Sequence, residues 1–161
     1  MIEAKVGDLT QCESVDYICN AANAQGPMGG GVAKAIREAG GNSIEKEAKQ
    51  QCNELKPIPG DIYITKAGAL PVKGIIHLVT MEQPAEASNY DSVRRCLATL
   101  LDFCEEEGVN SVALPALGTG VGGLDVEEVA GIVQEELAGS SVTFQVIDVD
   151  ESFIKQFNRE V

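Results

Sequence analysis

Basic residues are scarce in this chain of 161 residues, which has 12 Lys and Arg against 25 Asp and Glu and a formal net charge of −13 at pH 7. Proteins that bind a nucleic-acid backbone need clustered Lys and Arg, and anionic membrane surfaces repel a chain of this sign. The composition therefore argues against a nucleic-acid partner and a membrane partner. An anionic ligand would have to be held by backbone amides and helix dipoles rather than by side-chain cations.

Long apolar runs and paired cysteine motifs are also absent. The apolar runs extend over only a few residues, too short for a membrane-spanning helix. The five cysteines are odd in number and contain no CxxC pair, so we expect reduced thiols and no metal site. Residues 1–5 lack the pattern of a signal peptide, which predicts a cytoplasmic protein. The length and the 44% apolar content predict one globular domain over residues 1–161, which we expect to be monomeric.

Short apolar segments alternate with segments of helical periodicity along the whole chain. The first pattern predicts strands at 2–6, 15–20, 61–65, 74–80, 111–114 and 142–148. The second predicts helices at 32–39, 42–55, 91–107 and 125–137, and a terminal helix around Phe153 and Phe157. Asn42 and Glu45 have the spacing of a capping box at the start of the second helix. Strands that alternate with helices predict a three-layer α/β/α sandwich with a central mixed sheet of about six strands.

A glycine-rich turn separates the second predicted strand from the first predicted helix. Residues 29–31 are consecutive glycines, which let the backbone approach a ligand and leave its amides free. The N-terminus of the following helix adds partial positive charge, so the pattern is typical of a phosphate site. A plain turn between strand and helix is the alternative. Asn20 and Asn23, just upstream, favour the binding interpretation because carboxamides suit sugar hydroxyls.

A second glycine loop, at residues 118–123, also follows a strand and precedes a helix. Its spacing matches GxGxxG, but a dinucleotide-binding dehydrogenase needs more strand–helix units after this fingerprint than the remaining chain provides. The sequence contains no GxxxxGK[ST] motif, which argues against a P-loop enzyme. Two such loops at the carboxyl ends of strands suit a pyrophosphate lying between them.

Several motifs together resemble macrodomains, the modules that bind ADP-ribose. Asn20-Ala-Ala-Asn23 followed by Gly29-Gly-Gly-Val32 resembles the family signature. Further motifs resemble the family in the same order over nearly the whole chain, namely Gly7-Asp-Leu-Thr10, Ile75-Ile-His77 and the loop at 115–123. The resemblance implies a macrodomain fold, ADP-ribose or an ADP-ribosylated protein as partner, and no cofactor.

The resemblance also implies roles for particular residues. Asp8 would accept the adenine amino group and the Leu9 amide would assist it, although a turn or cap role is the alternative for Asp8. Asn23 would hold the distal ribose, while Asn20 is expected to hold the loop by hydrogen bonds. The other expected ligand contacts are Gly30, Gly31, Val32, Gly118, Thr119, Gly120, Val121, Gly122 and Val149.

Three positions depart from the family pattern. Val149 stands where an aromatic often stacks on adenine, and Gly122 where some members have an aromatic over the distal ribose, so we expect weaker binding than in those members. Ala33 replaces an aspartate that serves many hydrolytic members as a general base. Members that resemble this chain at Ala33 use a water activated by the phosphate of the substrate.

We therefore expect hydrolysis of ester-linked ADP-ribose, either on a mono-ADP-ribosylated protein or in O-acetyl-ADP-ribose. Asn23 and Gly31 are the expected catalytic residues. The alternative is a reader module that binds ADP-ribose without turnover. His77, the single histidine, lies in an apolar strand and is expected to be a satisfied core residue rather than a catalytic one.

Overall fold

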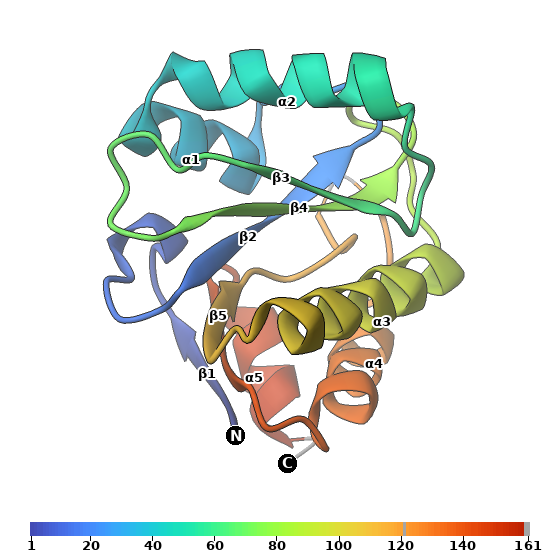
Figure 1. The fold of residues 1–161 in the computed structure, drawn as a ribbon. Coiled ribbons are helices and arrows are strands. Elements are labelled where there is room, and N and C mark those ends of the chain that lie inside the picture. Colours follow the sequence, from blue (N-terminus) through green and yellow to red (C-terminus); the bar gives the residue numbers. More distant parts are fainter. Residues whose placement is uncertain (121, 160–161) are drawn as a thin grey trace.

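The computed structural model describes residues 1–120 and 122–159. A six-stranded sheet runs through it in the order β1-β6-β5-β2-β4-β3 (Figure 1). All neighbouring strands are parallel except the pair β3 and β4, which is antiparallel. The strands are β1 (Ile2–Val6), β2 (Tyr17–Asn23), β3 (Ile62–Thr65), β4 (Gly74–Met81), β5 (Ser111–Leu114) and β6 (Thr143–Asp148). The predicted mixed sheet is therefore confirmed.

Helices cover both faces of the sheet, as predicted. The helices α1 (Gly31–Gly40) and α2 (Asn42–Leu55) pack on one face (Figure 1). The helices α3 (Tyr90–Glu107), α4 (Val126–Leu137) and α5 (Glu151–Arg159) pack on the other. A short 3-10 turn, η1 (Leu9–Gln11), follows β1. This arrangement confirms the three-layer α/β/α sandwich.

The sheet separates two hydrophobic cores, one under each layer of helices. The central strand β4 is buried from Gly74 to Thr80, because side chains on both of its faces meet helices. All five cysteines are free and buried, as expected of reduced thiols. Burial raises the pKa of Cys96 to about 12 and that of Cys104 to about 11, so these thiols are inert at neutral pH.

Strand β2 continues past its predicted end at Asn20 and reaches Asn23. Asn20 pairs in register with His77 of β4, and its side chain is 1% exposed, with Nδ2 3.1 Å from His77 Nδ1. The prediction that Asn20 holds the glycine-rich loop is therefore wrong. Pairing with β4 keeps Asn20 inside the sheet and carries the end of the strand to Asn23.

His77 is a buried, hydrogen-bonded core residue, as predicted. Its Nε2 lies 2.9 Å from the hydroxyl of Thr65, which donates its own proton to the Lys66 carbonyl. The ring therefore donates from Nε2 and accepts the Asn20 amide at Nδ1, which is the neutral form. Tyr63 stacks on the ring with centroids 4.5 Å apart. Burial without a charged partner lowers the pKa of His77 to about 3.

We expect the free energy of unfolding to fall as the pH drops from about 6.5 towards 3, because only the unfolded chain protonates His77 in this range. The slope is at most about 1.4 kcal/mol per pH unit. His77→Gln should lower stability at pH 7 but remove this slope. Urea unfolding of both proteins between about pH 4.5 and 7 avoids most carboxylate titration and measures the effect. Parallel slopes for the two proteins would contradict the prediction.

Candidate functional site

A cleft of about 680 Å³ opens at the carboxyl ends of the parallel strands. The two glycine loops follow β2 and β5, which are neighbours in the sheet. The chain leaves β2 towards α1 on one face and leaves β5 towards α4 on the other. Connections that diverge from neighbouring strands leave a crevice between them, the usual place for a ligand in an α/β sheet.

The predicted site residues come together in this cleft. Val121 lies outside the described residues, and every other predicted residue lines the cleft. These are Asp8, Leu9, Asn23, Gly30, Gly31, Val32, Gly118, Thr119, Gly120, Gly122 and Val149. Their contacts with a ligand remain a prediction.

The glycine-rich loop ends at the open N-terminus of α1. Gly30 precedes the helix without a side-chain cap, and the first helical bond runs from the Lys34 amide to the Gly30 carbonyl. The amides of residues 31–33 therefore come before the helical ladder and are available to an anion. Gly31 has φ +57, a left-handed conformation that favours glycine, and a Cβ at this position would meet nothing within 4 Å.

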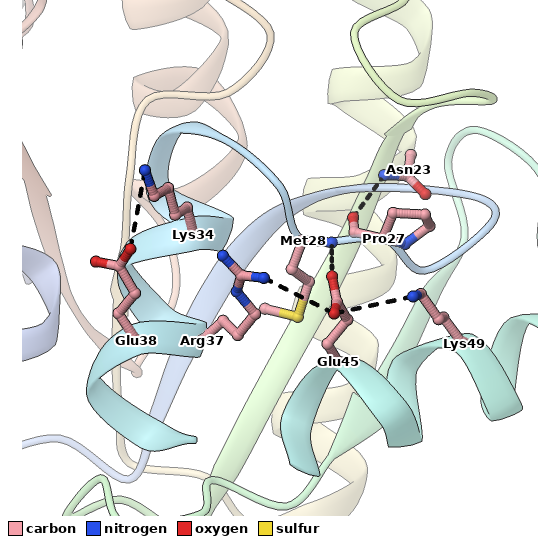
Figure 2. Close-up of polar contacts among 8 residues, drawn as sticks. All are labelled: Asn23, Pro27, Met28, Lys34, Arg37, Glu38, Glu45 and Lys49. Atoms are coloured by element: carbon pink, nitrogen blue, oxygen red, sulfur yellow. Dashed lines mark hydrogen bonds and ion pairs between the residues drawn. The ribbon is translucent and has the colours of Figure 1, made fainter. Parts of the chain in front are cut away.

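Asn23 lies at the end of β2 and holds the loop that leads to these glycines. Its Oδ1 accepts the amides of Gln25 at 2.9 Å and Gly26 at 2.8 Å. Its Nδ2 donates to the Pro27 carbonyl at 3.0 Å (Figure 2). One hydrogen of the carboxamide is left for a ligand after these three bonds. Asn23 thus has the loop-holding role that the sequence analysis gave to Asn20.

Asp8 caps the 3-10 turn that follows β1. One of its carboxylate oxygens, Oδ1, accepts both the Thr10 amide at 2.9 Å and the Thr10 hydroxyl at 2.7 Å. The capping role that the sequence analysis gave as the alternative for Asp8 is therefore confirmed. Asp8 is exposed at the cleft, and its second oxygen can still accept a donor such as an adenine amino group.

The second glycine loop folds back on itself. A Cβ at Gly122 would lie 2.5 Å from the Gly118 carbonyl oxygen, so this loop conformation has no room for a side chain there. The Gly122 carbonyl also accepts the Ser88 amide at 3.0 Å, which ties the loop to the segment before α3. The aromatic found at this position in some macrodomains would require another loop conformation.

The charges at the cleft are negative. Its charged side chains are Asp8, Asp148 and Asp150, and none of the described lining residues is Lys, Arg or His. Hydrogen bonds from the Ser152 hydroxyl and from backbone amides hold the pKa of Asp150 below its usual value. A phosphate in this cleft therefore meets no cationic side chain among the described lining residues, and the free backbone amides are its main donors.

The last residue of β4 and two residues after it complete the cleft and were missed from the sequence. Met81, Pro84 and Ala85 line it, although the sequence analysis did not assign residues 82–89 to a site. Their position in the sequence could have indicated the site, because they lie at or after the carboxyl end of β4. This strand is parallel to β2, so its carboxyl end reaches the same edge of the sheet. Ala85 has φ +60, an uncommon conformation for a residue with a side chain.

The described part of the chain lacks two other features. It contains no cluster of three or more His, Cys, Asp or Glu that could hold a metal ion. None of its helices is long and apolar enough to cross a membrane.

Comparisons with known proteins agree with this geometry. The family model described as Macro domain matches residues 19–133. A protein of Aquifex aeolicus is 37% identical over 98% of this chain and 96% of its own length. The solved Oceanobacillus iheyensis macrodomain with ADP has a TM-score of 0.87 and 26% identity, over 99% of this chain and 88% of its own. The macrodomain of Mycobacterium tuberculosis DarG has a TM-score of 0.83 and 26% identity, over 92% and 97%.

Proposed function

The chain belongs to the macro domain family, and we propose that it binds ADP-ribose in its cleft and hydrolyses an ester at the distal ribose of that ligand. The observation that carries binding is the pair of glycine loops facing one cleft whose described lining has no cation. Backbone amides from two neighbouring strands suit a pyrophosphate. The O. iheyensis macrodomain is described with ADP, and a mutant of it with ADPR, which supports the same ligand class here.

In this proposal the ligand extends across the ends of four strands. Adenine lies at the end formed by Asp8, Leu9 and Val149, where a carboxylate accepts its amino group. The pyrophosphate lies between the amides of residues 31–33 and those of the second glycine loop. The distal ribose lies beside Asn23, which offers it the remaining carboxamide hydrogen.

Hydrolysis proceeds through a water held between the ligand and the glycine-rich loop. The water oxygen attacks the ester carbonyl carbon while its proton passes to a phosphate oxygen of the ligand. The acyl–oxygen bond then breaks, the phosphate passes the proton on to the departing ribose oxygen, and a carboxylic acid and a free ribose hydroxyl are left. The Gly31 amide stabilises the developing negative charge, and Asn23 orients the ribose. Ala33 lines the cleft and cannot act as a base, which is why the phosphate takes this role.

A reader module is the second candidate, and one observation favours it. Among the described lining residues there is no Cys, Ser, His or Lys, and Thr119 is the one hydroxyl-bearing side chain. General catalysis needs a group within hydrogen-bond reach of the reacting bond. The carboxylates of the cleft, Asp8, Asp148 and Asp150, lie at the ends of β1 and β6, at the proposed adenine position rather than beside the distal ribose. Such a cleft can bind ADP-ribose and leave it intact.

Two measurements separate these outcomes. Calorimetry with ADP-ribose, AMP, ATP and NAD tests binding, and we expect ADP-ribose to bind in preference to the others. No heat with millimolar ADP-ribose, while another nucleotide binds, would overturn the proposal. Release of ADP-ribose from proteins modified on Asp or Glu, and deacetylation of O-acetyl-ADP-ribose, test turnover. Binding without either reaction would make the protein a reader.

Val149→Phe is expected to strengthen ADP-ribose binding by about three- to tenfold, since aromatic stacking adds about 1 kcal/mol. Val149 is 79% exposed at the cleft, so a larger ring has space beside the proposed adenine position. Val6→Phe is the matched control, because Val6 is 52% exposed at the end of β1 and is not a lining residue. Calorimetry of both variants measures the effect, and equal affinities in the two would contradict stacking at Val149.

A further inference from the structure

A charged cluster lies beside the glycine-rich loop, outside the residues that line the cleft. The Glu45 carboxylate of α2 accepts the Met28 amide at 2.7 Å through Oε2 (Figure 2). Its Oε1 lies 3.9 Å from Arg37 Nη1 and 3.8 Å from Lys49 Nζ. The Glu45 side chain is 19% exposed. One carboxylate therefore connects the loop, α1 and α2.

This contact replaces the capping box predicted for Asn42 and Glu45. The N-cap of α2 is Gly41, which makes no side-chain cap bond, and Asn42 is already the first helical residue. The capping-box prediction is wrong because the cap position falls on a residue without a side chain. The Glu45 carboxylate is free to turn to another backbone amide, that of Met28.

The segment before the glycines is held at several points. Asn23 bonds to the amides of Gln25 and Gly26 and to the Pro27 carbonyl, and Glu45 bonds to the Met28 amide. A Cβ at Gly26 would lie 2.6 Å from the Lys49 Cα, so the loop lies directly on the backbone of α2. The Met28 bond is the last side-chain anchor before residues 29–31, which have no side chains of their own.

The two cations beside Glu45 reduce the repulsion between its carboxylate and a bound phosphate. A lone carboxylate so close to an anion site would repel the phosphate, since the interaction between unit charges falls only slowly with distance in a protein. Arg37 and Lys49 offset this charge while the hydrogen bond to Met28 remains. Arg37 belongs to α1, the helix whose N-terminus faces the cleft, so the same cluster ties that helix to α2.

We propose that Glu45 is a positioning residue of the glycine-rich loop, which it holds through the Met28 amide so that the glycines at 29–31 present the free amides of residues 31–33 to the ligand. This inference rests on the proposed binding of ADP-ribose. Glu45 touches no ligand and acts only through the loop. The bond to Met28 needs an acceptor oxygen, whereas the ion pairs to Arg37 and Lys49 need a negative charge.

The test compares Glu45→Ala, which removes the acceptor, with Glu45→Gln, which keeps an acceptor and removes the charge. We expect Glu45→Ala to weaken ADP-ribose binding about tenfold or more and Glu45→Gln to keep most of the wild-type affinity. Amide hydrogen exchange of Met28 should accelerate in the alanine variant and stay slow in the glutamine variant. Calorimetry and exchange are both measured on the full chain.

Glu47→Ala is the matched control. Glu47 lies on the same helix, and its carboxylate accepts the Lys66 amide at 3.0 Å, a bond of the same kind to a different loop. It should leave ADP-ribose affinity unchanged. Wild-type affinity in Glu45→Ala, or equal losses in Glu45→Ala and Glu45→Gln, would overturn the positioning role. Failure of the wild type to bind ADP-ribose would instead overturn the proposed function, while the exchange data would still report on the Met28 bond.

Discussion

Gly31→Glu is expected to lower ADP-ribose affinity by at least about 100-fold and to abolish turnover, because it places a carboxylate at the open N-terminus of α1. Gly31 lines the cleft and has φ +57, so the new side chain also brings a strain of about 1–2 kcal/mol. Repulsion of the pyrophosphate and loss of space for it act together. Calorimetry with ADP-ribose and the ester-release assay measure the two effects.

Gly108→Glu is a close control for this variant. Gly108 has φ +64 at the C-terminus of α3, a Cβ there would meet nothing within 4 Å, and it is not a lining residue of the cleft. The substitution adds the same charge and a similar strain at a distance from the ligand. We expect Gly108→Glu to lose stability and keep its affinity. A Gly31→Glu protein that binds ADP-ribose within a few-fold of the wild type would remove the glycine-rich loop from the proposed site.

The elements of the fold could be predicted from the sequence because their signals are local. The apolar run at 74–80 is β4, and the periodic segment at 42–55 is α2 with the predicted ends. The glycine loops could be placed in one cleft for a similar reason. Each follows a parallel strand, and carboxyl ends of parallel strands meet at one edge of a sheet.

The exchange of roles between Asn20 and Asn23 could not be predicted in the same way. Residues 21–23, Ala-Ala-Asn, have little intrinsic preference for a strand, so the pattern ends at Asn20. Pairing with β4 extends β2 to Asn23, which lies opposite Met81 after a register shift. Which carboxamide stays inside the sheet and which reaches the loop depends on this register between distant segments.

The hydrogen bond between the Met28 amide and Glu45 could not be predicted from the sequence for a related reason. The spacing of Asn42 and Glu45 satisfies a local rule, but that rule does not include competing amides from elsewhere in the chain. The loop before Gly29 passes over α2 and presents the Met28 amide to the carboxylate. A position that departs from a local pattern in this way is often near a functional site.

Asn23→Ala is expected to reduce turnover by more than it reduces ADP-ribose affinity. The substitution removes three hydrogen bonds and leaves the buried Gly26 amide without its acceptor, which costs about 1–3 kcal/mol of stability for that group alone. The loss of these loop anchors should lower affinity, as in Glu45→Ala, but in the proposed binding mode adenine beside Asp8 and the far phosphate at the second glycine loop would keep their contacts. The distal ribose and the attacking water lose their alignment, and misalignment weakens the transition state most.

Asn20→Ala separates this effect from a general loss of stability. Asn20 lies on the same strand, is 1% exposed and bonds to His77, but it does not line the cleft. Its removal should lower the free energy of unfolding and leave both affinity and turnover per folded molecule unchanged. The ratio of turnover to affinity, compared among the wild type and the two variants, is the measurement. Equal losses of rate and affinity in Asn23→Ala would show that Asn23 only holds the loop, because an orienting residue acts more strongly on the transition state than on the bound ligand.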